Sequence, residues 1–560
     1  MVTWAEILMW REMPLLDAYE AVSAAEASIE VAGEVLYRAE VNFSSEGDAA
    51  ESARRVIVEL RQDMDLVEGQ LSDLMLEFRR VAAEVEELSF RVRNVQLSAV
   101  SALLEVSEFG VVSYSQTLWN MIDEEFSNLV EVTPEEWYHL ISRSDTTSWR
   151  RAAPVKVELE EEIRDLIKRA CEIDESLARV CDSILEGEVS SRSSMLSGDN
   201  ISVDAALTTL NELGEVAEVR AFWDVLSPSV QESLVTAFPD IIGSFNGIPF
   251  EVRLKANRVN SLKRVSELEE RVEELDSEID ALGPRVGESA AFDLADLKSD
   301  RLRVMQELEY INAVLEDPDR GFILFDPGSS RIIEQNGPLR DSVTEIYTHV
   351  PGTGASLSSF IDESATGFPV ALREQGAALS MEISTFTYMD GGYTGKGGWI
   401  TWPGGGRGNT NAEYLVEKGR QLADFQSALR LEDGARGADI NIGGHSAGQS
   451  PIFASEVMGA WYDQSSSFAG SYSPVEWKGN AATSYDHFYY EQEPINLMNI
   501  GSAEHPYKSK WYEQHRFDHG EGVMGYLNGV GHHTRVNSAD PNNDAVILEQ
   551  LHQMQLSGQN

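Results

Sequence analysis

The sequence predicts two classes of structure in one chain: an all-α N-terminal part and a C-terminal α/β domain with a mostly parallel sheet. Three observations support this division. Apolar residues recur at helical spacing over most of residues 1–320, a heptad series ends near residue 282, and from Gly321 short apolar runs alternate with helical patterns. We therefore expect three regions, at residues 1–190, 191–320 and 321–560.

The first region is typical of two long helices joined by a short polar turn. One helix is expected from about Leu15 to Val41, and the next begins near Asp48. The second helix carries apolar residues at spacings of three and four: Val56, Leu60, Met64, Val67, Leu71, Leu74, Phe78, Val81 and Val85. Such a hairpin cannot bury its apolar stripe alone, so it packs on further helices or on a partner protein.

The middle region begins with a polar linker near residue 190 and continues into a small helical core around Trp223 and Leu234. A heptad series follows: Val265, Leu268, Val272, Leu275, Ile279 and Leu282. It stops at Gly283-Pro284, and a return helix reaches about Leu315. The pattern predicts an antiparallel coiled-coil hairpin that spaces or packs against the next domain, with dimerisation as the alternative.

Composition restricts the possible partners and the compartment. With 44 Lys and Arg against 94 Asp and Glu, the formal net charge is -50. That charge argues against nucleic acid and against anionic lipid, both of which attract basic proteins. No uncharged apolar run predicts a transmembrane helix. The first residues lack a basic leader, so we expect a cytoplasmic protein, or one exported by a leaderless, type VII-like route without a conventional signal peptide.

The two cysteines do not form a disulfide framework. Cys171 and Cys181 lie ten residues apart in one predicted helix. A rise of 1.5 Å per residue separates them by about 15 Å along the helix axis, too far for a bond.

In the third region, apolar runs that predict strands are separated by helical patterns. The expected strands are 322–325, 344–350, 381–387, 438–443 and 495–500, and a final helix is expected over 543–554. This alternation over about 240 residues predicts the α/β class.

The most informative motif is Gly444-His445-Ser446-Ala447-Gly448. It stands between a predicted strand, 439–442, and a predicted helix, 451–458. Strand, sharp Gly-flanked turn with Ser at its apex, and helix form a nucleophile elbow, in which the glycines allow close approach of neighbouring chain. The helix N-terminus directs backbone N–H groups toward a developing oxyanion. Ser446 is therefore the candidate nucleophile, and an ordinary turn between strand and helix is the alternative.

A serine hydroxyl needs a base, which in turn needs an acid. In this kind of fold the acid and then the histidine follow the serine along the chain. His532 lies on a loop before the final predicted helix and is the candidate base, with His533 as its competitor. Glu504, after the predicted strand 495–500, is the candidate acid, and Asp518 is the reserve.

An oxyanion hole requires a second backbone N–H besides that of Ala447. The strand 344–350 ends in Pro351-Gly352-Thr353-Gly354, whose Gly-rich chain can approach the serine, and the N–H of Thr353 is the candidate donor. No metal or organic cofactor is expected. The Gly-rich run over 391–408 departs from the phosphate-loop pattern, and His515 with His519 lacks the neighbouring Glu and third ligand of a zinc protease.

Several separate pieces together resemble an actinobacterial α/β-hydrolase domain family whose substrates are generally unassigned. They are Leu226-Ser227-Pro228, Asn246-Gly247-Ile248-Pro249, Ala256-Asn257-Arg258, Val350-Pro351-Gly352-Thr353-Gly354, Gly444-His445-Ser446-Ala447-Gly448 and Gly531-His532. The resemblance implies an α/β-hydrolase fold with Ser446 as nucleophile, His532 as base and an acid at the Glu504 position. The family usually has Asp at that last position.

Residues 1–190 resemble the small WXG-type helical-hairpin proteins and their fused relatives, which are associated with specialised secretion in Gram-positive bacteria. The matching residues are Trp4 and Trp10 near the start of the hairpin, and Gly47 to Ala53 after its turn.

Together these observations predict a serine hydrolase of esterase or lipase-like type. It would cleave a small carboxylic ester or related acyl bond through an acyl-serine intermediate. The alternatives are a non-catalytic interaction protein that uses its N-terminal helices to bind a protein partner, and an exported effector.

Overall fold

A computed structural model describes most of the chain. The described residues are 2–42, 48–126, 147–187, 201–282, 288–392, 411–491, 493, 496, 504–518, 533–539 and 544–558. They form two compact units. Unit 1 comprises Met1–Val230 with Asn480–Ala482, and unit 2 comprises Gln231–Gly479 with Thr483–Asn560. The predicted middle region, 191–320, is thus divided between the two units.

Unit 1 is built on long helices. α2 (Met13–Asn42) and α3 (Asp48–Ser101) confirm the two predicted helices and pack along each other. α3 also packs against α6 (Thr147–Leu185), where the end of its predicted apolar stripe, Val81 and Val85, is buried with residues such as Ile163 and Leu166. The beginning of the stripe, at Val56 and Leu60, is exposed. The other described elements of the unit are α1 (Trp4–Ile7), β1 (Leu104–Val106), β2 (Val112–Tyr114), α4 (Gln116–Phe126), α8 (Val203–Glu212) and α9 (Val216–Asp224).

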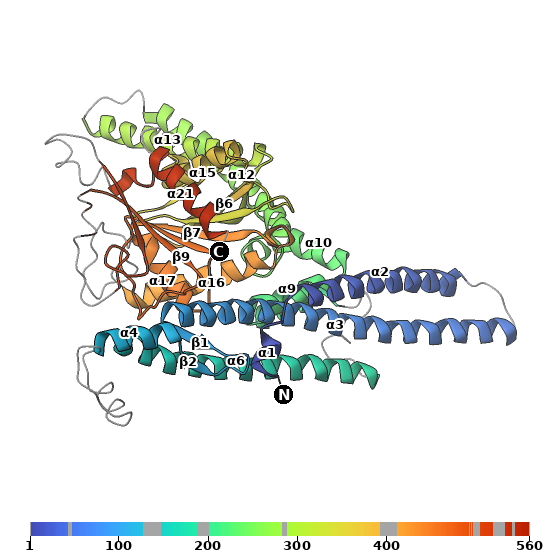
Figure 1. Ribbon diagram of the computed structural model, residues 1–560. Coiled ribbons are helices and arrows are strands. Elements are labelled where there is room, and N and C mark those ends of the chain that lie inside the picture. Colours follow the sequence, from blue (N-terminus) through green and yellow to red (C-terminus); the bar gives the residue numbers. More distant parts are fainter. Residues whose placement is uncertain are drawn as a thin grey trace. The chain divides into compact units, whose positions relative to one another are not determined.

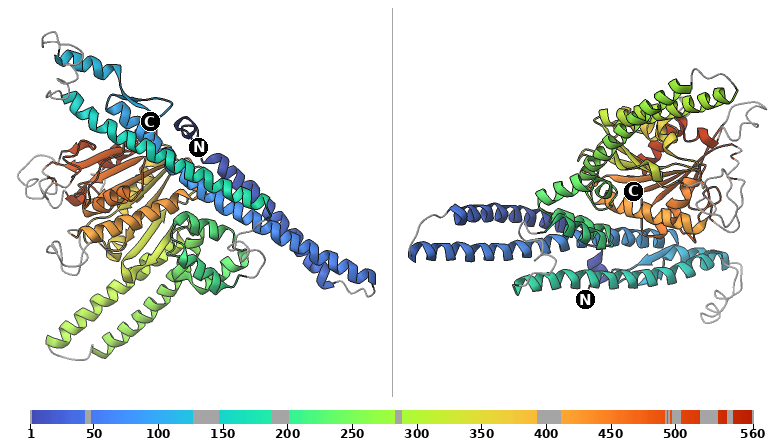
Figure 2. Two further views of the ribbon diagram at one scale, coloured as in Figure 1. Left: turned by 90° about the horizontal axis from the view of Figure 1, so that it is seen from below. Right: turned by 180° about the vertical axis from the view of Figure 1, so that it is seen from behind.

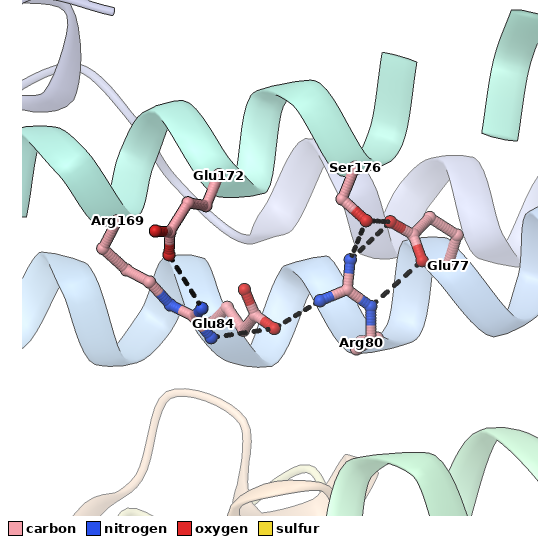
Figure 3. Close-up of polar contacts among 6 residues, drawn as sticks. All are labelled: Glu77, Arg80, Glu84, Arg169, Glu172 and Ser176. Carbon is pink, nitrogen blue, oxygen red and sulfur yellow. Dashed lines mark hydrogen bonds and ion pairs between the residues drawn. The ribbon is translucent and has the colours of Figure 1, made fainter. Parts of the chain in front are cut away.

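A polar network joins α3 to α6 beside this apolar contact (Figure 3). Arg80 donates to Ser176 at 2.7 Å and to Glu77 Oε2 at 3.0 Å, and it also pairs with Glu84. Arg169 on α6 reaches Glu84 at 3.2 Å. Because Glu77 is buried, Arg80 and Ser176 supply the partners that its carboxylate needs away from water.

The predicted coiled-coil hairpin lies in unit 2. α12 (Phe250–Leu282) and α13 (Glu288–Glu316) run side by side (Figure 2). Their antiparallel register is marked by Arg264 bonding Glu307 at 2.7 Å and Arg301 bonding Asp276. Heptad residue Leu268 is buried in the same cluster as Phe322 of the sheet. The hairpin therefore packs on the α/β fold, as one of the predicted alternatives proposed.

Unit 2 centres on an eight-stranded sheet with the order β10-β9-β8-β7-β5-β6-β4-β3. β4 is antiparallel to both of its neighbours, and all the other pairs are parallel. The strands are β3 (Arg320–Asp326), β4 (Arg331–Asn336), β5 (Glu345–Val350), β6 (Ile383–Asp390), β7 (Asp439–His445), β8 (Gln464–Phe468), β9 (Ser484–Tyr490) and β10 (Glu513–Phe517).

Helices cover both faces of this sheet (Figure 1). On one face, α15 (Gly367–Ala378) and α21 (Asp544–Ser557) bury Phe368 and Leu551 against Tyr347 of β5. On the other face, α16 (Ala412–Arg430) bonds Thr348, the next residue of β5, through Gln426 and packs on α17 (Gln449–Val457). The shorter helices of the unit are α10 (Pro228–Ala237), which begins in unit 1, α11 (Pro239–Ile242) and α14 (Leu357–Ile361).

Four predicted strands are confirmed, because β3, β5, β6 and β7 overlap the expected ranges. The predicted final helix, 543–554, is confirmed by α21. The predicted strand 495–500 lies almost wholly outside the described residues. β4, β8, β9 and β10 were not expected. β8 reads QSSSF yet is buried at every position, and hydrophobic periodicity cannot find a buried strand made of serines.

None of the described helices combines the length and the hydrophobicity that a membrane-spanning helix requires. Cys171 and Cys181 are free thiols.

Candidate active site

The order of the strands creates a site at the carboxyl ends of β5 and β7. These strands are parallel neighbours. After β5 the chain continues to β6, on one side of the pair, and after β7 it continues to β8, on the other side. Connections that leave in opposite directions open a crevice beyond the strand ends, which is where α/β sheets bind ligands. Val350 and His445 end the two strands.

Ser446 stands at the apex of the turn between β7 and α17. Its φ is 53°, in the left-handed region that side chains other than glycine seldom adopt. The neighbouring glycines explain how the turn is accommodated. A Cβ at Gly444 would lie 2.7 Å from Cα of Gln449, and a Cβ at Gly448 would lie 2.2 Å from the carbonyl oxygen of Val350. The sequence therefore forms a sharp, strained elbow of the predicted kind.

The loop after β5 lies directly against this elbow. A Cβ at Gly352 would be 2.9 Å from Cβ of Ser446 and 3.0 Å from Nδ1 of His445. Thr353 follows at once, so its backbone also lies beside the elbow. A pocket of about 680 Å³ opens here, lined by residues that include Gly352, Thr353, His445 and Thr534.

Of the two candidate bases, His533 lies among the described residues, and its side chain is bonded to Glu493. Nδ1 of His533 donates to Oε1 of Glu493 at 2.9 Å. The His533 side chain is 10% exposed and that of Glu493 is 0% exposed. Because a carboxylate only accepts, Nδ1 carries the hydrogen in this contact, which leaves Nε2 as the nitrogen that could exchange a proton with a substrate or nucleophile. The favoured candidate, His532, lies outside the described residues.

His445 connects the base to the elbow. Its Nε2 lies 2.9 Å from the backbone carbonyl oxygen of His533, and the two imidazole centroids are 4.9 Å apart. Burial, and then the neighbouring His533, lower the pKa of His445 to about 3. The ring is therefore neutral at physiological pH, and its Nε2–H donates to the carbonyl.

The two acids considered from sequence lie on other segments than Glu493. The backbone carbonyl of Glu504 accepts from the N–H of Ser473 at 2.8 Å, and Asp518 directly follows β10. Among the described contacts, the carboxylate bonded to His533 is that of Glu493. Sequence reasoning missed Glu493 because it placed the penultimate strand at 495–500. Among the described strands the penultimate one is β9, which ends at Tyr490, and the acids that follow it at once are Glu491 and Glu493.

A second cluster contains the ligand types of a metal site. Asp486, Glu513 and His515 have ligand atoms within 4.8 Å of one another. However, the two nitrogens of His515 face Asp486 at 2.7 Å and Glu549 at 3.3 Å. Burial opposes the charged form of His515, but the bond to Asp486 and the nearby carboxylates raise its pKa. Because both ring nitrogens of His515 already face carboxylates, this cluster is explained by the contacts that join β9, β10 and α21.

Comparisons with known proteins add little to this geometry. No family model matches the chain, and no curated protein matches it significantly. Among solved structures, the crystal structure of TT1662 from Thermus thermophilus is similar over 37% of this chain and 94% of that chain. The identity is 12% and the TM-score is 0.20, a likeness that carries no argument about fold or reaction.

Proposed function

We propose that this chain is a serine hydrolase of α/β-hydrolase type, which cleaves a carboxylic ester or related acyl bond through an acyl-Ser446 intermediate. The observation that carries the proposal is Ser446 at a left-handed φ, directly after His445, whose ring bonds the carbonyl of His533, the histidine that is paired with the buried Glu493. An ordinary turn between strand and helix needs neither the strain nor the buried pair of base and acid.

The topology supports the same proposal. A mostly parallel sheet whose second strand, β4, is antiparallel, and whose fifth strand, β7, leads into the serine turn, is the arrangement of the α/β-hydrolase fold. The candidate acid, Glu493, follows β9, and the candidate base, His533, follows β10 and precedes α21. The chain order serine, acid, histidine is the order of that fold.

Each residue has a role in the proposed reaction. Nε2 of His533 takes the proton of the Ser446 hydroxyl as the oxygen attacks the acyl carbon, and later returns it to the leaving group. Glu493 holds the imidazole in the productive tautomer and stabilises its charged form. The backbone N–H groups of Ala447 and Thr353 would bind the oxyanion. His532 remains the alternative base.

The substrate is proposed to bind in the pocket beside Gly352 and Thr353. Its other lining includes Ser359, Asp362 and Asn537, besides small apolar residues. Polar groups at such positions favour a short or polar ester over a long acyl chain, because an apolar chain would leave them without hydrogen bonds.

A protein partner for the N-terminal helices is a second proposal, favoured by one observation. Large apolar side chains in the second half of α2 and at the beginning of α3 are exposed, including Val31, Tyr37, Val41 and Val56 at 65%, 55%, 64% and 53%. Clustered exposed apolar residues are typical of interaction surfaces. Crosslinking of the full chain in cells, with Val41→Glu as the variant expected to lose the product, tests it.

A fluorescent fluorophosphonate probe tests the hydrolase proposal, because it labels only activated serines. The wild type should label, whereas Ser446→Ala and His533→Ala should not. Ser330→Ala is the matched control, because Ser330 also has a left-handed φ, of 58°, but lies in the turn between β3 and β4. Labelling that survives Ser446→Ala, or a folded wild type that does not label, would refute the proposal. Loss with His532→Ala but not with His533→Ala would move the base to His532.

A further inference from the structure

We propose that His445, the residue before the serine, is a positioning residue that holds the segment beginning at the base, residues 533–539, against the elbow. The inference rests on the proposed function and assigns a role that the three triad residues do not fill. The contacts that support this role are those of the His445 ring with His533 and with the loop after β5.

The first contact is with the backbone of the base. A carbonyl oxygen only accepts, so the 2.9 Å contact between His445 Nε2 and the His533 oxygen requires a hydrogen on Nε2. Since burial keeps the pKa of His445 near 3, the ring does not titrate at physiological pH and the donor is constant. His445 is thus suited to holding a neighbour rather than to exchanging protons.

The second contact is with the loop after β5. A Cβ at Gly352 would lie only 3.0 Å from Nδ1, the other ring nitrogen of His445. The ring therefore packs closely against the backbone of Gly352. His445 itself begins the elbow, one residue before Ser446. A single ring, on the residue next to the nucleophile, therefore bonds the backbone of the base and lies against the loop of the candidate oxyanion donor.

His533 is consequently held at two points. Glu493 binds the Nδ1 end of its side chain, and His445 binds its main chain while its ring packs on the imidazole at 4.9 Å. Glu493 alone would leave the imidazole free to swing with its backbone. Displacing a catalytic group by about 1 Å is enough to cost on the order of 100-fold in rate.

Two substitutions of His445 distinguish the effect of its hydrogen bond from the effect of its side-chain volume. His445→Gln keeps an N–H donor at a similar reach, and His445→Leu keeps much of the volume without a donor. We expect His445→Leu to slow fluorophosphonate labelling by about 10- to 100-fold. With p-nitrophenyl acetate, kcat should fall and KM should hold, because positioning acts on the chemical step. His445→Gln should recover most of the loss.

A second measurement needs no activity. In protein carrying nitrogen-labelled histidine, the downfield proton between His533 Nδ1 and Glu493 should be present in the wild type and absent in His533→Gln. It should persist in His445→Gln and broaden or vanish in His445→Leu, provided that thermal unfolding shows both variants to be folded. A merely structural role would lower the unfolding temperature without this selective loss.

The outcomes distinguish this inference from the function on which it rests. If the wild type labels and His445→Leu labels equally fast, the positioning role is overturned while the hydrolase proposal stands. If the wild type does not label, the hydrolase proposal fails and the proton measurement decides the role of His445. An unchanged proton in His445→Leu, or a change in KM alone, overturns the positioning role.

Discussion

Glu493 accepts a hydrogen bond from Nδ1 of His533 at 2.9 Å, across 40 residues of sequence, and both side chains are nearly inaccessible to solvent. A buried carboxylate is costly unless it is paired, so this bond links the stability of the loop after β9 to the orientation of the candidate base. The same pair also identifies which carboxylate to test first.

Replacing Glu493 by Gln should lower kcat for p-nitrophenyl acetate by about 100- to 10,000-fold, because an amide can favour the wrong tautomer of His533. Steady-state hydrolysis and fluorophosphonate labelling measure the loss. Glu504→Gln is the control and should keep at least half of the wild-type rate. A larger loss in the Glu504 variant would restore Glu504 as the acid.

Gly352→Ala should reduce labelling of Ser446 by at least about 10-fold, because the added methyl would lie 2.9 Å from Cβ of Ser446 and must displace the elbow or the loop. Gly328→Ala is the control, since its nearest contact would be an ordinary 3.6 Å. Equal labelling of the two variants would mean that the loop after β5 does not limit the site.

Stability should depend on pH through Glu345 of β5. Burial, and then Asp439 and Asp463, raise the pKa of this carboxyl to about 8, while a bond from Asn441 opposes the shift. A raised folded-state pKa favours the protonated form. The stabilising effect of the protonated carboxyl is therefore complete below the ordinary glutamate pKa of 4.5 and is lost as pH rises through about 8.

Glu345→Gln removes this titration. The free energy of unfolding of the variant should exceed that of the wild type increasingly between about pH 5 and 8, by roughly 1 to 3 kcal/mol at the upper end. Urea unfolding followed by fluorescence at several pH values measures the difference. The exposed Glu382, changed to Gln, is the control. A difference that does not vary with pH would show that Glu345 ionises normally in the folded protein.

The contact between α3 and α6 should weaken when Arg80 is replaced by Met. Glu77 would then keep Ser176 but lose its cation, and breaking a partly buried pair costs about 1 to 3 kcal/mol. Hydrogen exchange in α3 and α6 should report a lower opening free energy of that size. Arg93→Met, at an exposed position of the same helix, is the control. Unchanged protection in the Arg80 variant would show that the apolar contact alone joins these helices.

Features encoded in short segments could be predicted well. The hairpin of α12 and α13 could be predicted from the heptad series and the Gly-Pro break after it. The elbow could be predicted from Gly444, Ser446 and Gly448 between a strand and a helix. Hydrophobic periodicity failed to predict strands whose polar residues are buried by neighbouring elements on both faces of the sheet. The strand β8, with Ser465 and Ser466 inside the sheet, is such a case, as is β9, whose mixture of Asp and aromatic residues has no simple period.

By itself, the sequence determined the class of each half of the chain and the place of Ser446, because strand, turn and helix preferences act between near neighbours. Only the tertiary structure decided that Glu493 pairs with His533, and that His445 reaches the carbonyl of His533 from 88 residues away. These contacts depend on the order of strands in the sheet. That order is set by the burial of whole elements against one another, and no local pattern records it.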